Sequence, residues 1–147
     1  MYQKILVTTD GSSLSKKAVR SAVELAASLG AELVALHVVP RYPVSYFDGG
    51  MNVSPLEVAR TEKSWNDKGR AMVDAVVLQA EAAGVACKGA VMQSDLVAES
   101  IQAAAKKHKC DLIVMASHGR RGLKRLLLGS ETQHVLTHGS VPVLVLR

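Results

Sequence analysis

Two short apolar runs, one helix length apart, limit most strongly what this chain can fold into. The run 5–7 reads Ile-Leu-Val, and a second run extends from Leu33 to Val39, where Pro40 ends it. Such runs are typical of strands buried on both faces of a sheet. Between them, apolar residues recur at helical spacing and Gly30 follows as a helix C-cap. The pattern predicts a strand–helix–strand unit, and a crossover of this length makes the two strands parallel.

The same alternation continues to the end of the sequence. We expect a long loop over 40–54, helices over 55–83, 95–109 and 130–138, and strands over 85–92, 111–116 and 141–146. Residues 1–147 then form one α/β domain, a Rossmann-like three-layer α/β/α sandwich around a five-stranded parallel sheet. The predicted strand order is 3-2-1-4-5, with the third and fifth strands at the edges.

Composition narrows the class of protein. The chain has 147 residues, 48% hydrophobic and 21% charged, which is ordinary for a soluble domain. No apolar run approaches the roughly 18 residues that a membrane span needs. Cys87 and Cys110 lie far apart in no metal or redox spacing, and no basic, apolar leader opens the sequence, so we expect the cytoplasm. The net charge of +5 is compatible with a phosphorylated ligand. We interpret the cations of helix 55–83 as a solvent-exposed face and expect no binding of nucleic acid.

Residues 116–130, ASHGRRGLKRLLLGS, combine glycines, cations and a Gly-Ser pair that opens a helix. In the predicted sheet, ligands bind where the strand order reverses, between the first and fourth strands. Gly119 and Gly129 allow close backbone approach, and a helix that starts at Ser130 directs free amides at an anion. Hydroxyls and cations that can contact a phosphate lie nearby: Ser130, Thr132, Arg120, Arg121, Lys124 and Arg125. The segment is either a phosphate cradle or a plain helix N-cap with its cations in solvent.

The familiar phosphate motifs are absent from the sequence. It contains no GxxxxGK[ST], which excludes a P-loop ATPase, and no GxGxxG after the first strand, which disfavours a nicotinamide cofactor. The spacing Gly119-x9-Gly129-Ser130, after Ala116-Ser117-His118, instead resembles the nucleotide loop of the universal stress protein family, Gly-x2-Gly-x9-Gly-Ser/Thr. KILVTTDGS, LHVV, DLIVMASHGRRG and VPVLVLR extend the resemblance over the whole chain.

The resemblance implies an adenine nucleotide alpha hydrolase-like fold and an adenine nucleotide site. Residues that it places along the adenine and ribose are Thr8, Thr9, Asp10, Val38 and Met115. Residues that it places along the ribose and phosphates are Gly119, Gly129, Ser130 and Thr132. His118, in the same loop, either contacts phosphate or faces solvent.

Two positions depart from the family pattern. Ala116 replaces the first glycine, and its methyl group crowds a backbone that must pass close to a ligand. Glu131 puts a carboxylate near the expected phosphates, where it favours the helix dipole, shares a Mg²⁺ or repels the nucleotide.

Other residues keep two interpretations each. Asp10 is either a ligand for ribose or a metal-bound water, or a cap for the following helix. His134 and His138 are spaced i, i+4, but without an evident third ligand a solvated helix face explains them better than a metal does. His37 is expected to be a hydrogen-bonded core histidine.

The last strand is almost wholly aliphatic, and an apolar edge strand invites pairing with another chain. We therefore expect a homodimer through this strand, as the family resemblance also implies, unless a helix or loop of the same chain covers it. The strand residues concerned are Val143, Leu144, Val145 and Leu146.

Three functions from different classes compete. The first is a cytoplasmic stress-response protein that binds ATP or another adenine nucleotide, with or without Mg²⁺, as ligand or regulator. The second is a slow ATPase or nucleotide phosphotransferase at the same pocket, for which Asp10, Glu131 and His118 are the candidate groups and none is a clear catalytic base. The third is a nucleotide-free dimer that acts through protein contacts, an interpretation that Ala116 favours.

Overall fold

A computed structural model of the chain describes residues 1–43, 54–119 and 128–147. The predicted loop residues 44–53 and the cations Arg120, Arg121, Lys124 and Arg125 lie outside the described residues. The elements, in chain order, are β1 (Lys4–Thr8), α1 (Ser13–Leu29), β2 (Glu32–Val39), α2 (Pro55–Ala82), β3 (Cys87–Gln93), α3 (Val97–Lys107), β4 (Leu112–Ala116), α4 (Ser130–His138) and β5 (Val143–Leu146).

The five strands form one parallel sheet in the order β3-β2-β1-β4-β5, which confirms the predicted topology. Strand β1 lies at the centre, where Ile5 is in register with Leu33 of β2 and with Leu112 of β4. The strand order reverses between β1 and β4, so the carboxyl ends of these two strands lie side by side. Strands β3 and β5 form the two edges, as predicted.

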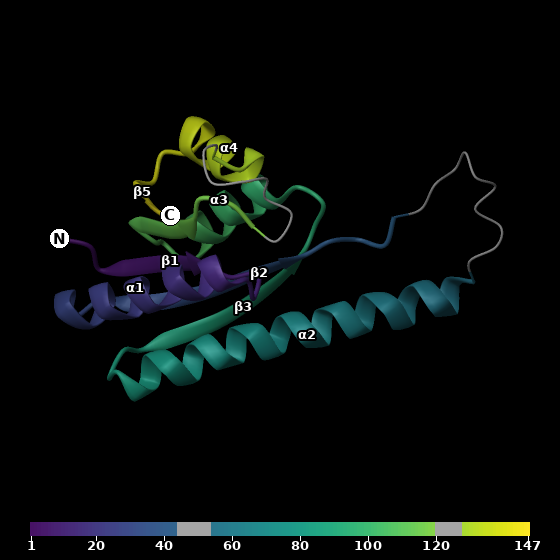
Figure 1. Cartoon of the computed structure of the whole chain (residues 1–147), viewed down its shortest axis with the longest axis horizontal. Helices are drawn as coiled ribbons and strands as arrows, with labels where there is room; N and C mark the ends of the chain where they lie inside the picture. The colour runs from purple at the N-terminus through teal and green to yellow at the C-terminus, as the bar shows by residue number, and fades with distance from the viewer. Residues whose placement is uncertain (44–53, 120–127) are drawn as a thin grey trace.

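Two apolar clusters hold the helices on opposite faces of the sheet (Figure 1). Alternate residues of β1 divide between them: Ile5 and Val7 pack beneath α1 and α2, and Leu6 packs beneath α3 and α4. All three side chains are fully buried. The three-layer α/β/α sandwich follows directly from strands that are apolar on both faces.

Helix α2 is the longest element, with 28 residues, and only its C-terminal half packs on the sheet. Its buried residues begin at Gly69, where an added Cβ would lie 2.6 Å from Cδ2 of His37, so the helix and β2 approach closely at this point. The N-terminal half extends past the sheet (Figure 1), and its Trp65 stacks on Tyr42, in the segment after β2, with ring centroids 6.0 Å apart. Trp65 lies between Lys63 and Lys68, so the solvated cationic face expected for this helix also carries an aromatic ring.

Both cysteines are free within the described part of the chain. Burial raises the pKa of the Cys87 thiol and that of the Cys110 thiol to about 11. Neither is therefore a reactive thiolate at neutral pH, as their isolated positions in the sequence suggested. In the described residues, no helix combines the length and the apolar character that crossing a membrane requires.

Candidate functional site

The turn after β1 is built from short polar side chains that bond to one another. The Thr9 hydroxyl is 3.4 Å from Oγ of Ser15 and accepts the Gly11 amide at 3.3 Å. Oγ of Ser15 donates to the Ser12 carbonyl at 3.0 Å, and Oγ of Ser12 accepts the Ser15 amide as the N-cap of α1. Thr9 and Ser15 are buried at 7% and 3% exposure, so their hydroxyls belong to the framework of the turn.

Asp10 extends from this turn toward β4. Its Oδ1 accepts the Ser12 amide at 2.9 Å, so the carboxylate supports the turn before α1, while Ser12 and not Asp10 caps the helix. Its Oδ2 faces Gly119, where an added Cβ would lie only 2.7 Å away. Asp10 and Gly119, separated by more than a hundred residues in sequence, therefore meet at the switch point.

His37 fixes the end of β1 from the neighbouring strand. Nδ1 of this half-buried ring lies 2.7 Å from the Thr9 carbonyl oxygen, which confirms the expected hydrogen-bonded histidine. Together with Ser12 and Ser15, His37 shapes the turn that carries Asp10. Sequence reasoning assigned none of these three to the site, although the Ser12-x-x-Ser15 spacing is a recognisable capping signal.

The carboxyl end of β4 holds the start of α4. The Gly129 amide donates to the Ser117 carbonyl at 2.7 Å, and Oγ1 of Thr132 donates to the Ala116 carbonyl at 3.0 Å. An added Cβ at Gly129 would lie 3.2 Å from the Ser117 carbonyl oxygen, so a side chain there would push the helix away. Thr132 is 2% exposed, and in this structure its hydroxyl joins α4 to β4.

Helix α4 begins without a side-chain cap in the described residues. Its N-cap is Gly129, which has no side chain, whereas Ser12 supplies a cap to α1. Ser130, the first helical residue, is exposed, and His118, whose Nδ1 lies 3.2 Å from Oγ of Ser117, is half-buried beside it in the fold. An uncapped helix start with a dipole and a free hydroxyl can accept an anion.

Ala116 is accommodated within the core. The residue is 8% exposed and belongs to the apolar cluster beneath α1, in register with Leu146 of β5. Its methyl group therefore packs in the interior. Val38 and Met115 lie on the other face of the sheet and share the cluster beneath α3, with Val38 partly exposed and Met115 buried. Thr8, at the end of β1, is also partly exposed.

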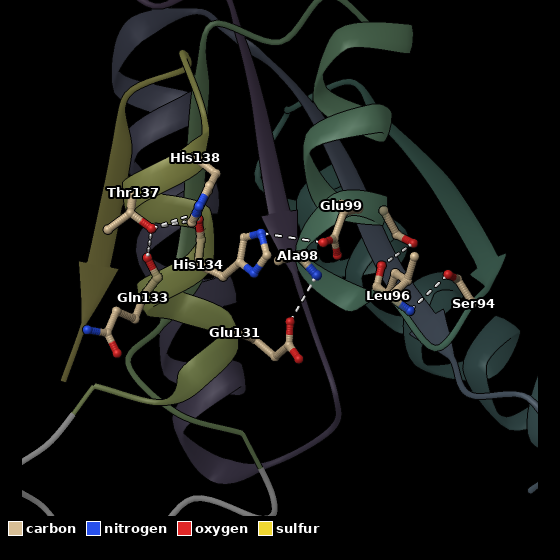
Figure 2. Close-up of polar contacts among 10 residues, drawn as sticks. Ser94, Leu96, Ala98, Glu99, Glu131, Gln133, His134, Thr137 and His138 are labelled. Carbon is tan, nitrogen blue, oxygen red and sulfur yellow. Dashed lines mark hydrogen bonds and ion pairs between the residues drawn. The ribbon is translucent and has the colours of Figure 1, made fainter.

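Glu131 is directed at the neighbouring helix (Figure 2). Its Oε2 accepts the amide of Ala98, in the first turn of α3, at 3.0 Å. Helix α3 has no side-chain cap of its own, because its N-cap residue is Leu96. Glu131 thus supplies from α4 the negative charge that the start of α3 lacks.

A second contact between the same helices involves His134. Its Nε2 lies 3.4 Å from Oε1 of Glu99 on α3, and its ring lies 4.3 Å from that of His138 (Figure 2). Within the described residues, no group of three potential ligands could hold a metal ion. In the structure the two histidine rings contact each other, and His134 contacts Glu99, at the surface between α3 and α4.

Comparisons with known proteins agree over the whole chain. Residues 1–147 match the universal stress protein family. Universal stress protein MJ0531 of Methanocaldococcus jannaschii is 33% identical over all of this chain and 83% of its own length. Universal stress protein YxiE of Bacillus subtilis is 32% identical over the full length of both chains. The solved structure of MJ0577 aligns with a TM-score of 0.83 at 25% identity, over 99% of this chain and 96% of that chain.

Some structures with this fold were solved with nucleotides. A universal stress protein in complex with cAMP aligns with a TM-score of 0.69 at 25% identity, over 99% of this chain and 97% of that chain. A family protein from Arabidopsis thaliana with AMP bound shares the fold at 21% identity and a TM-score of 0.68, over 97% of this chain and 90% of its own. The strand order, the whole-length match and these relatives lead to one conclusion: the chain belongs to the universal stress protein family.

Proposed function

We propose that the protein binds an adenine nucleotide where β1, β4 and the start of α4 meet. The observation that carries this proposal is the start of α4, where, within the residues that the structure describes, Gly129 leaves the helix without a side-chain cap and Ser130 is exposed. Phosphate oxygens would accept hydrogen bonds from the first amides of α4 and from the Ser130 hydroxyl. The positive end of the helix dipole favours the same charge.

The opposite end of the proposed site has the chemistry of a nucleoside pocket. Asp10 can accept a hydrogen bond from a ribose hydroxyl, and the partly exposed Val38 offers apolar surface to a base. Gly119 keeps space open beside Asp10, because a Cβ there would collide with its carboxylate. The relatives solved with cAMP and AMP support the same class of ligand.

Glu131 does not weaken the proposal. Its carboxylate accepts the Ala98 amide, which turns the negative charge toward α3. A phosphate group at Ser130 would therefore not meet this charge directly. We propose ATP as the physiological nucleotide, with Asp10 as the described carboxylate best placed to approach a Mg²⁺ ion through water.

The proposal is tested on purified protein. Any nucleotide released on unfolding is identified by mass spectrometry, and stripped protein is then titrated calorimetrically with AMP, cAMP and ATP, with and without Mg²⁺. We expect saturable binding that is roughly tenfold or more weaker in Ser130→Ala, since a hydrogen bond to a charged group contributes about 1.5–3 kcal/mol. Gly129→Ala should also weaken binding, because its Cβ would press on the Ser117 carbonyl oxygen and displace the start of α4.

A matched control separates this loss from a general effect on helix starts. Ser13 is the first residue of α1, as Ser130 is of α4, and both residues are exposed to solvent. Ser13→Ala should bind nucleotide like the unmodified protein, and GMP should bind more weakly than AMP. The absence of saturable binding, or equal losses in Ser13→Ala and Ser130→Ala, would contradict the proposal.

We also propose that β5 pairs with β5 of a second copy. In the described part of the chain, β5 pairs only with β4, and Leu144 is 40% exposed at this edge. Light scattering should give the mass of a dimer for the unmodified protein and for Leu78→Lys, which changes an exposed leucine on α2, but a smaller mass for Leu144→Lys. A monomeric unmodified protein would refute the dimer. The free cysteines fit a reducing, cytoplasmic setting for this assembly.

A further inference from the structure

A second hollow lies between α1 and α2, on the face of the sheet opposite Val38 and Met115. It has a volume of about 260 Å³ and begins at the turn after β1. Two groups of residues line it: the apolar Val19, Met72, Ala75 and Val76, and the polar or flexible Thr9, Gly11, Lys16, Arg20 and Gln79. We refer to this space as the α1–α2 groove.

The charged residues that line the α1–α2 groove are of one sign. Lys16 and Arg20 lie one turn apart on α1, and among the described residues no carboxylate lines the groove. Within the described residues, neither cation makes an ion pair or a hydrogen bond, whereas the adjacent Lys17 donates to the Arg147 carbonyl at 2.8 Å. Two cationic side chains without a partner among the described residues therefore lie beside the apolar residues that line the groove, which we call its floor.

The apolar floor of the groove includes side chains that are already almost fully buried, so they lose little solvent exposure when a ligand contacts them. Val19 and Val76 are 3% and 5% exposed, and Ala75 is small enough to leave room above the helix. An apolar chain laid along these residues would lose water-exposed surface, which is worth about 25 cal/mol for each Å² removed from water. A negative head group at the same time would meet Lys16 and Arg20.

We propose that the α1–α2 groove binds a medium-chain fatty acid anion such as octanoate. The acyl chain lies against Val19, Ala75 and Val76, and the carboxylate pairs with Lys16 and Arg20. The volume of the groove, about 260 Å³, lies below the roughly 300–1,000 Å³ of sites for drug-sized ligands, which favours a single acyl chain over a peptide or a nucleotide. This inference goes beyond the proposed nucleotide site and does not depend on it.

The test uses octanoate as the probe and the full chain labelled with ¹⁵N. We expect saturable chemical-shift changes at the amides of Gly11, Val19 and Val76. Arg20→Glu should weaken binding roughly tenfold, because it replaces an attractive charge with a repulsive one. Ala75→Leu should fill the groove and abolish binding without altering any charge.

Two controls isolate the groove and the charge. Lys106→Glu makes the same change in net charge on α3, which packs on the other face of the sheet, and should bind octanoate normally. The alcohol 1-octanol carries the same chain without the charge and should bind several-fold more weakly. The proposal is overturned if octanoate shows no saturable binding, if Ala75→Leu or Arg20→Glu binds it normally, or if 1-octanol binds equally well. Circular dichroism and melting curves verify that each variant is folded.

Discussion

The turn after β1 and the start of α4 lie at the same end of the sheet and use their polar groups in opposite ways. In the turn, Thr9, Ser12 and Ser15 bond to one another or to nearby backbone; Thr9 and Ser15 are buried, and Ser12 caps α1. At α4, Gly129 supplies no cap within the described residues, and Ser130 is exposed. The hydroxyls of the first region are engaged within the protein, whereas the second region has amides and a hydroxyl that can donate to a ligand. Changes at Thr9, Ser12 or Ser15 should reduce stability, and changes at Ser130 should reduce ligand binding.

The largest loss of stability is expected for Ser15→Ala. This change removes a buried hydroxyl that donates to the Ser12 carbonyl at 3.0 Å and lies 3.4 Å from the Thr9 hydroxyl. Losing these contacts, together with the hydrogen bond that the Asp10 amide donates to Oγ of Ser15 at 3.4 Å, costs about 1–3 kcal/mol of unfolding free energy, measurable by urea denaturation. Ser13→Ala should stay within about 0.5 kcal/mol. If Ser15→Ala and Ser13→Ala lowered the unfolding free energy equally, the buried Ser15 hydroxyl would contribute no more to stability than the exposed Ser13 hydroxyl.

Variants of Glu131 test the start of α4, because this residue follows Ser130 in sequence but accepts the Ala98 amide of α3. Glu131→Ala should lower the unfolding free energy by about 1 kcal/mol through loss of the charge at the start of α3, and Glu131→Gln by less. Nucleotide affinity should change less than twofold in both variants. A large gain in affinity in either variant would mean that the carboxylate faces the phosphates in solution.

The smallest change in stability is expected for Asp111, at the opposite end of the sheet, far from both the turn after β1 and the start of α4. There Asp111 accepts the Gln3 and Lys4 amides at 2.8 and 3.1 Å. Burial acts to raise the pKa of this carboxyl, but the hydrogen bonds from Gln3 and Lys4 outweigh it and lower the pKa below the usual value. Its contribution to stability is therefore complete above the unfolded pKa of about 3.9 and is lost as the pH falls through the folded pKa.

The measurement is the melting temperature of the unmodified protein and of Asp111→Asn between pH 6 and 2.5. The unmodified protein should melt higher at pH 6, and the difference should shrink as the pH falls. A difference that stays constant with pH would show that the carboxylate charge does not contribute.

The elements of this fold could be predicted because the strands are buried on both faces. Their apolar runs mark them without reference to the rest of the chain, and their alternation with helices fixes parallel pairing. The boundaries that differed depend on local hydrogen bonds that hydropathy does not show. Val85 was expected to begin a strand, but its amide donates to the Ala80 carbonyl at the end of α2. Helix α3 was expected from Asp95, but Oγ of Ser94 accepts the Leu96 amide and holds a turn there.

The site could be predicted as far as topology decides it. The strand order brings the segments after β1 and β4 to the same end of the sheet, where Asp10 lies beside Gly119. The sequence could not predict where the Glu131 and Thr132 side chains point, because each direction depends on how α4 packs. A glutamate in a first turn suits its own helix dipole as well as that of a neighbour, and only the packing of α3 against α4 selects Ala98. The Thr132 hydroxyl was expected at phosphate and in the structure joins the Ala116 carbonyl.

The strand order also has a consequence for the growing chain on the ribosome. Strand β1 is made first but lies at the centre of the sheet, and its second neighbour, β4, follows only after α3. Three of the five strands, β1, β2 and β3, can therefore assemble first, while β1 lacks its second neighbour until about a hundred further residues have been synthesised. Asp10 meets Gly119 only when β4 pairs with β1, and α4 follows later still. The candidate site is thus among the last parts of the molecule to form, and a ligand that requires it would distinguish finished molecules from unfinished ones.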